Sequence, residues 1–292
     1  MPRATHALAI AASLALLSAG AARAGSSDEG VPRVVTFGGS CPSCSLSGRK
    51  LTGASFTGGN FDKASLVDTD LRGASFTATT FRGSDFTRAD LRSASLLGVN
   101  FSQAVFTDAR MDGVEGAGPN FSGAELKRAR LVSAQLVGAN MMGAGLQDAQ
   151  LTGAELVASN LIGVDARRAD FHGADLTGAR LNKGRFADAS FKGTELDGAD
   201  LSGGDFARAD FRGASLRGTR FSEADLSSAR GLTQDQIDDA CVDGTTHLPP
   251  GLSAKGCHGV HVSMHIPAIP RPPVPPAPPA PPSPAAWAHH PN

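Results

Sequence analysis

The sequence predicts an elongated all-β solenoid, because a short apolar repeat runs without a break through most of its 292 residues. Every fifth residue from Leu46 to Leu226 is a large-residue position, and 33 of these 37 positions hold Leu or Phe. The position two residues earlier is mostly Ala, and the remaining positions are polar or Gly. A period of five fits neither an α-helix nor a flat strand, so the chain must turn once in every repeat. Stacked coils are the arrangement that buries one large and one small residue from each repeat.

Glycine recurs two residues after the large position, as at Gly53, Gly73 and Gly83. This position suits a tight turn that needs a positive φ. The large and small residues are expected to point inward, and the other three residues of each repeat are expected to face water.

Units such as 89–93 (ADLRS) and 199–203 (ADLSG) resemble the A(D/N)LXX unit of the pentapeptide repeat family, and the resemblance extends over residues 44–230. The family implies a right-handed quadrilateral β-helix with four repeats in each coil. The 37 repeats then predict about nine coils, and a coil spacing like that of neighbouring strands predicts a rod roughly 43 Å long.

In that geometry, residues 20 apart in the sequence stack on the same side of the rod. Stacked aromatic rings stabilise a core beyond the area that they bury. The sequence predicts one ladder from Phe61, Phe81, Phe101 and Phe121, and another, on a different face, from Phe171, Phe191 and Phe211.

Residues 111–120 lose the repeat pattern but keep its register. Gly116 stands at a large-residue position and Pro119 at a small one. We expect a bulge or a small outward loop here, and a tolerated defect is favoured over a binding loop.

A second irregularity places Ala166 at a large-residue position beside Arg167 and Arg168. Two adjacent guanidinium groups can grip a carboxylate or a phosphate. A solvated charged face is the favoured interpretation, because Asp165 and Asp170 can neutralise the pair.

Residues 1–24 have the features of a signal peptide, with Arg3 before an apolar run and Ala22-Arg23-Ala24 as the cleavage pattern. Cleavage near Ala24 would send the mature chain to the periplasm or out of the cell. No other segment is apolar enough to span a bilayer, so no membrane span is expected in the mature chain. Residues 25–40 are interpreted as a lead-in, and residues 41–230 as the repeat domain.

Residues 231–265 are predicted to form a C-terminal cap, because an open solenoid must cover its apolar edge. Thr233 and Gln236 form a capping box that opens a short helix, expected to run to about Val242. Part of this stretch, 231–252, resembles the segment that often follows secreted bacterial pentapeptide domains. Residues 266–292 are rich in proline and are expected to be an extended, disordered tail.

The four cysteines fall into two pairs at opposite ends of the repeat domain. A disulfide needs Cα atoms within about 7 Å, so no bond can cross the rod. We predict a disulfide between Cys241 and Cys257, which flank a Pro-Pro-Gly turn. Cys41 and Cys44 form a CxxC that either pairs with itself or stays reduced, and a structural role is favoured over redox chemistry.

His258, His261 and His265 follow Cys257 closely in the sequence. Imidazole, thiolate and thioether ligands together suit copper or zinc, so a metal-binding tail is an alternative function. No helix fixes these side chains, and Cys257 has a competing use in the disulfide.

The sequence shows no catalytic constellation, and no cofactor is expected. The repeat domain carries 22 Lys and Arg against 22 Asp and Glu, so its charges cancel. Some proteins of the family resemble duplex DNA and bind topoisomerase, but that role needs an acidic surface, and nucleic acid itself is not an expected partner. The favoured function is a non-enzymatic structural or protein-interaction module outside the cytoplasm. Its protein partner is not identified, and a homo-oligomer stays open.

Overall fold

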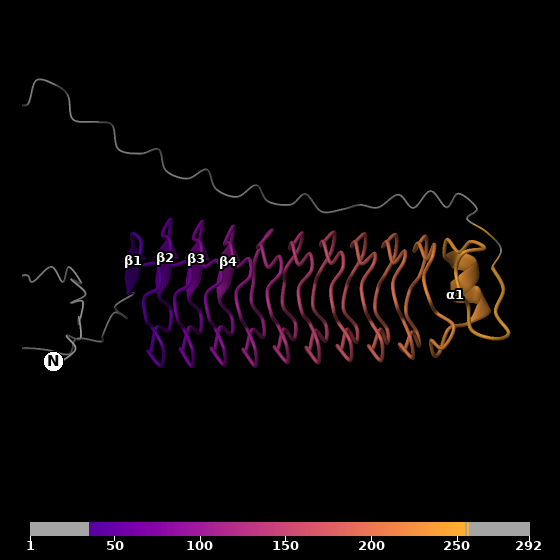
Figure 1. The fold of residues 1–292 in the computed structure, drawn as a ribbon, viewed down its shortest axis with the longest axis horizontal. Coiled ribbons are helices and arrows are strands. Elements are labelled where there is room, and N and C mark those ends of the chain that lie inside the picture. Colours follow the sequence, from indigo (N-terminus) through magenta and orange to yellow (C-terminus); the bar gives the residue numbers. More distant parts are fainter. Residues whose placement is uncertain (1–34, 255, 257–292) are drawn as a thin grey trace, which may run out of the picture. The chain divides into compact units, whose positions relative to one another are not determined.

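The computed structural model describes residues 35–254 and 256, and residues 35–254 form a rod of stacked, four-sided coils (Figure 1). The architecture is a right-handed quadrilateral β-helix closed by one short helix, which confirms the predicted fold class. The predicted signal peptide, most of the lead-in and the proline-rich tail lie outside the described residues. The named elements are the strands β1 (Thr36–Gly38), β2 (Ser55–Thr57), β3 (Ser75–Thr77) and β4 (Ser95–Leu97) and the helix α1 (Gln234–Asp239).

From β2 to Arg230 the coils stack in a strict 20-residue register. Strands β2 and β3 pair in parallel with Phe56 opposite Phe76, and single parallel bridges continue the same spacing as far as Asp210 and Arg230. The large residues of the repeats typically donate their N–H to the next coil, as Leu91 does to the carbonyl of Arg110 at 2.7 Å. The backbone of one coil is therefore satisfied by its two neighbours.

The large and small positions fill the interior as the sequence predicts. Phe81 and Phe101 are fully buried. The rings of Phe61 and Phe81 stack with centroids 5.0 Å apart and planes 13° apart, and those of Phe191 and Phe211 stack at 5.0 Å and 9°. Both predicted ladders are confirmed.

Hydroxyl residues at small positions remain buried without losing a hydrogen bond. The hydroxyl of Ser84 donates to the carbonyl of Phe61 at 2.8 Å, and that of Thr194 donates to the carbonyl of Phe171 at 2.7 Å. A buried hydroxyl is costly only when it has no partner. The coil therefore accepts Ser or Thr where the repeat usually has Ala.

Glycines at small positions make room for aromatic rings, as at Gly184 and Gly204. A Cβ at Gly184 would lie 2.4 Å from Cε2 of Phe186, and one at Gly204 would lie 2.5 Å from Cε2 of Phe206. The two rings stack on each other at 5.1 Å with planes 3° apart. Each ring thus occupies the space that an alanine methyl takes in a typical repeat.

The expected bulge at 111–120 is absent, and that prediction was wrong. Met111 and Val114 are buried as in any other repeat, and Gly116 donates its N–H to the carbonyl of Gln135 at 2.8 Å. A Cβ at Gly116 would lie 2.9 Å from the carbonyl oxygen of Leu96. The backbone itself approaches the preceding coil where the large side chain is missing, so the coil closes without a loop.

The first coil begins earlier than the sequence predicts. Strand β1 lies in the predicted lead-in and pairs with β2, with Phe37 opposite Phe56. The ring of Phe37 stacks on that of Phe56 at 4.7 Å and so extends the Phe56–Phe76 stack by one ring. The repeat pattern is lost at this point in the sequence although the coil geometry persists.

The C-terminal helix α1 covers the last coil. Thr233 accepts from the N–H of Gln236, and the Gln236 side chain accepts from the N–H of Thr233, so the predicted capping box is confirmed. The helix ends at Asp239 rather than near Val242, because Cys241 donates its N–H to the carbonyl of Thr219 at 2.7 Å and rejoins the coil.

The cap closes the apolar edge with buried side chains and backbone bonds. Ile237 and Val242 are buried in the same core cluster as the repeats, and Gln236 donates to the carbonyl of Ala214 at 2.8 Å. Within the described ranges, no helix has the length and apolar character needed to cross a bilayer.

Candidate interaction surface

The candidate metal ligands His258, His261 and His265 lie outside the described residues, as does Cys257. The disulfide between Cys241 and Cys257 therefore stays a prediction. Over residues 35–254, no three His, Cys, Asp or Glu side chains are grouped so that they could hold a metal ion.

Cys41 and Cys44 are half-buried free thiols at the N-terminal edge of the core. The N–H of Cys44 donates to the carbonyl of Cys41 at 3.3 Å, which closes the turn between them. Burial, together with the contact to Cys41, raises the pKa of the Cys44 thiol to about 12. A reactive cysteine needs a lowered pKa, so this geometry favours the structural role.

Arg167 and Arg168 do not act as a pair. Arg167 donates through Nε and Nη2 to Asp165, both at 2.7 Å, while Arg168 donates in the same way to Asp148 at 2.6 and 2.8 Å. The expected neutralisation is confirmed for Asp165, but the partner of Arg168 is Asp148 rather than Asp170. The two guanidinium groups are already occupied by carboxylates of the same chain.

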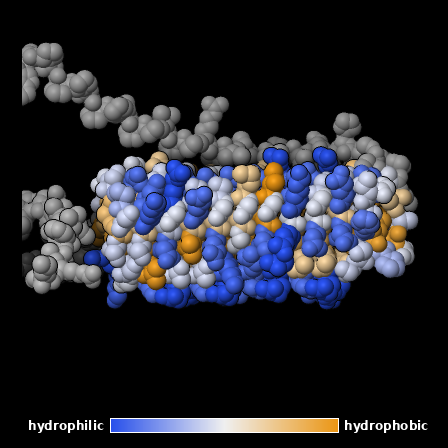
Figure 2. All heavy atoms as spheres, viewed as in Figure 1, coloured by the Kyte–Doolittle hydropathy of each residue, from blue (hydrophilic) through white to orange (hydrophobic). Residues whose placement is uncertain are grey.

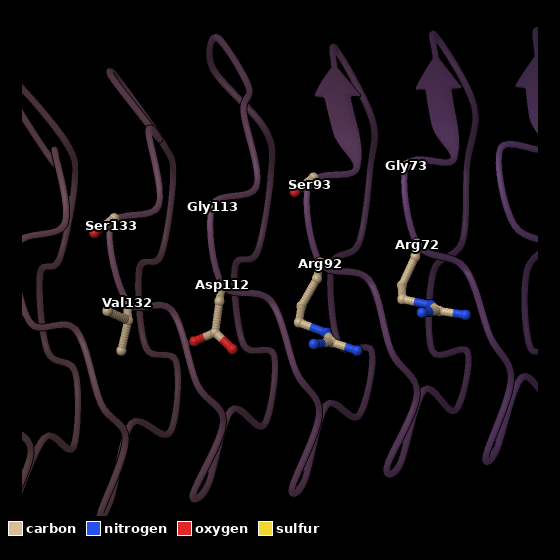
Figure 3. Close-up of a pocket in the computed structure, with 8 residues that line it drawn as sticks. All are labelled: Arg72, Gly73, Arg92, Ser93, Asp112, Gly113, Val132 and Ser133. Atoms are coloured by element: carbon tan, nitrogen blue, oxygen red, sulfur yellow. The ribbon is translucent and has the colours of Figure 1, made fainter.

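One side of the rod, which we name the charged face, carries ion pairs around a shallow hollow of about 690 Å³. Figure 3 shows Arg72, Arg92, Asp112 and Val132 in one row across successive coils, with Gly73, Ser93, Gly113 and Ser133 in a parallel row.

Each of the two arginines in this hollow binds an aspartate of its own repeat. Arg72 lies 2.7 Å from Asp70, and Arg92 lies 2.6 Å from Asp90. Because their carboxylate partners are in place, this hollow does not offer a ready anion site.

The ion pairs of the charged face make stability depend on pH. Hydrogen bonds from Arg72 lower the pKa of Asp70 to about 2, and those from Arg212 do the same for Asp210. An unfolded aspartate titrates near 3.9. The pairs therefore contribute fully above about pH 4, and their contribution is lost as the pH falls toward 2.

We expect Asp210→Asn to lower the unfolding free energy by less than about 1 kcal/mol at pH 7, because Arg212 is mostly exposed and the pair is screened. The difference in unfolding free energy between wild type and variant should shrink as the pH falls from about 4 to 2, because only the wild type has a carboxylate at residue 210 that can be protonated. Denaturant titrations across this range measure it. A difference that stays constant with pH would show that the pair does not titrate as described.

A second side of the rod, which we name the uncharged face, carries a ladder of asparagines. The amide of Asn120 donates to Asn100 at 3.3 Å, that of Asn140 to Asn120 at 3.2 Å, and that of Asn160 to Asn140 at 3.3 Å. Each Oδ1 also accepts an N–H two residues further along, as Asn100 does from Ser102 at 3.0 Å. These bonds fix the side chains, so the face is rigid.

Apolar side chains stand beside this ladder. Met142 is 50% exposed and is one of the two large hydrophobic residues that are exposed in the described part of the chain. Ile162 follows one coil later at the same position and is half-buried. Small residues surround them, so Met142 projects above its neighbours; these are Ser102, Ser122, Gly123, Gly143 and Gly163.

The uncharged face differs from its surroundings. On this face, the outward positions of residues 100–103, 120–123, 140–143 and 160–163 hold no charged side chain. Arg82 and Arg180 flank the face at its two ends. Figure 2 shows one side of the molecule in which hydrophilic residues predominate and hydrophobic ones are isolated. A rigid, uncharged strip with a projecting Met is the part of the rod best suited to docking a protein, since interface centres are depleted in charge and enriched in Met.

This face was not predicted from the sequence, because each asparagine considered by itself is an ordinary polar position between repeats. The signal was present as the recurrence of Asn at intervals of 20 residues from Asn100 to Asn160. It is seen only when the outward positions are sorted by coil.

A family model described as "Pentapeptide repeats (8 copies)" matches residues 50–115 and 117–230, which is more than half of the chain. The chain therefore belongs to the pentapeptide repeat family. None of the curated proteins compared with the chain matches it.

Several solved structures are similar in repeat type. HetL, a pentapeptide repeat protein involved in heterocyst differentiation regulation from Nostoc sp. strain PCC 7120, is 28% identical, with 74% of this chain and 87% of that chain covered and a TM-score of 0.33. Full-length QnrB1, a plasmid-mediated fluoroquinolone resistance protein, is 18% identical, with 72% and 94% covered and a TM-score of 0.29. A pentapeptide repeat protein from the Arabidopsis thaliana thylakoid lumen is 23% identical, with 43% and 66% covered and a TM-score of 0.21.

Proposed function

We propose that this protein is a non-enzymatic interaction module that acts outside the cytoplasm and docks a protein partner on its uncharged face. The observation that carries the proposal is the exposed Met142 on a rigid asparagine ladder without charge. A partner that covers this face can bury Met142 without having to desolvate an ion pair.

The rest of the described surface supports an interaction role over catalysis. Ion pairs such as Arg72 with Asp70 and Arg88 with Asp68 recur at outward positions elsewhere on the described rod. The hollow on the charged face holds arginines already bound to aspartates, and the Cys44 thiol has a raised pKa of about 12. These features stabilise a rod, and such a rod presents its faces without rearranging.

The extracytoplasmic location rests on the signal-peptide pattern of residues 1–24. On this proposal, protein recovered from the exported fraction begins at Gly25, which N-terminal sequencing determines. Protein that keeps Met1 and stays in the cytoplasm would contradict the location.

The docking surface is tested by capture with three forms of the exported protein: wild type, Met142→Glu and His172→Glu. His172 is exposed at the equivalent repeat position on the charged face, so it is a matched control. We expect a protein that wild type and His172→Glu retain to be lost, at least tenfold, with Met142→Glu, because the new carboxylate must be buried without a partner. Equal capture by all three forms would place the docking surface elsewhere.

A further inference from the structure

One corner of the rod, which we name the alternating corner, changes the sign of its charge at every coil. The corner consists of the residues two positions after the large residue on the side that includes Leu66, Phe86 and Phe106. The sequence of charges is negative then positive, repeated over eight successive coils: Asp68, Arg88, Asp108, Arg128, Asp148, Arg168, Asp188 and Arg208.

The backbone at this corner favours glycine. All eight residues have φ between 56° and 60°, in the left-handed region where side chains are disfavoured. The neighbouring corner uses Gly at most of the equivalent positions, for example Gly173, Gly193 and Gly213. Nine other non-glycine residues of the described rod adopt a similar φ, but this corner has a charged side chain at eight successive positions.

Within the chain, the corner forms four bidentate ion pairs. Arg128 donates through Nε and Nη2 to Asp108 at 2.6 and 2.7 Å, and the same geometry joins Arg88 to Asp68. Exposed ion pairs contribute little to folding because water screens them. The free energy of such an ion pair is too small to offset the conformational cost of holding two non-glycine residues at positive φ.

The ion pairs keep the capacity to bind a second partner. Arg128 is 46% exposed and Asp108 is 40% exposed. Nη1 of Arg128 makes no hydrogen bond within residues 35–254, so two N–H donors remain, and each carboxylate oxygen can accept a further bond. The corner thus presents alternating donors and acceptors to whatever lies beside it.

The row is complementary to itself when reversed. Eight alternating charges read backwards give the opposite sign at every position. In an antiparallel copy related by a two-fold axis between Arg128 and Asp148, Asp68 lies opposite Arg208 and Arg88 lies opposite Asp188. In a parallel copy in register, every charge lies opposite its own kind. An isologous contact needs this kind of self-complementary surface.

The column beside the corner leaves room for a close approach near both ends, whereas Lys127, Gln147 and Arg167 are long side chains near its middle. It holds short side chains toward both ends, including Val67, Thr87, Ala187 and Ala207. Eight coils spaced like neighbouring strands give a contact about 34 Å long.

We propose that a second copy of this chain docks antiparallel along the alternating corner, so that each Asp of one copy faces an Arg of the other. The contact is independent of the uncharged face, which lies on a different side of each coil. Because it depends on exposed charges, it weakens as salt is raised.

Two single substitutions and their mixture test this pairing, with the mass of the full-length secreted protein measured by sedimentation at low salt. Arg88→Asp places two carboxylates opposite each other in the homodimer, and Asp188→Arg places two guanidinium groups there. We expect each variant alone to dimerise at least tenfold more weakly than wild type. An equimolar mixture restores both opposite-charge contacts, so the two variants should form a heterodimer of wild-type affinity.

The mixture separates this contact from a role within the chain, because mixing repairs no intrachain ion pair. Lys183→Asp, at an exposed positive-φ position on another corner, is the control and should dimerise like wild type. A monomeric wild type at low salt would overturn the proposal, as would a mixture that stays monomeric. Single variants that dimerise as wild type does would also overturn it.

Discussion

Replacing Phe81 with Ala is expected to lower the unfolding free energy by about 3–5 kcal/mol, because the side chain is fully buried in a well-packed core. Its ring lies 5.0 Å from that of Phe61 and 5.7 Å from that of Phe101, so its removal opens a cavity between two coils. Denaturant titration of the wild type and the variant measures the change.

Arg82→Ala is the matched control, because Arg82 is the next residue and points outward. Its change should stay within about 0.5 kcal/mol. Asp85 is less suitable as a control, because it is half-buried and accepts from the N–H and the hydroxyl of Thr87 at 2.9 and 2.6 Å. Equal losses for Phe81→Ala and Arg82→Ala would contradict the inward and outward assignment.

Gly204→Ala is expected to lower the unfolding free energy by about 1–3 kcal/mol, although Ala is the commonest residue at this repeat position. The added methyl carbon would lie 2.5 Å from Cε2 of Phe206. That ring is held by its stack on Phe186 and by Phe191 and Phe211, so it cannot move aside freely.

The same clash predicts a rescue. Combining Gly204→Ala with Phe206→Leu recreates the Ala-x-Leu pair seen at Ala199 and Leu201, so the double variant should be more stable than the sum of the single losses predicts. Gly145→Ala is the control, because its methyl would meet only the outward Gln147 side chain, at 3.1 Å. Strict additivity in the double variant would mean that the ring and the glycine are not coupled.

The architecture could be predicted because one rule repeats in every unit. The large residue at every fifth position fixes the interior, and its strict register fixes which residues stack 20 apart, as the Phe61 and Phe81 rings show. The capping box of Thr233 and Gln236 was equally local, because its two bonds lie within a single helical turn.

The errors arose where contacts between coils override the local pattern. Gly116 was interpreted as a break, but the backbone closes on Leu96 of the preceding coil. Phe37 lies outside the repeat register, yet it completes a coil by stacking on Phe56. The candidate docking surface was missed for a similar reason, since the asparagine ladder exists only between coils and has no signature within one repeat.

The alternating corner also sets how the rod can change in length during evolution. Removing one coil, 20 residues, leaves the backbone bonds in register, because the coils share the same 20-residue spacing. The same deletion within the row brings two like charges together at the corner and leaves seven charges. An antiparallel copy then no longer places an opposite charge at every position. Removing two coils preserves both the backbone register and the row. Descendants that keep the corner in use should therefore differ in length by even numbers of coils, whereas those that have lost it are free to differ by single coils.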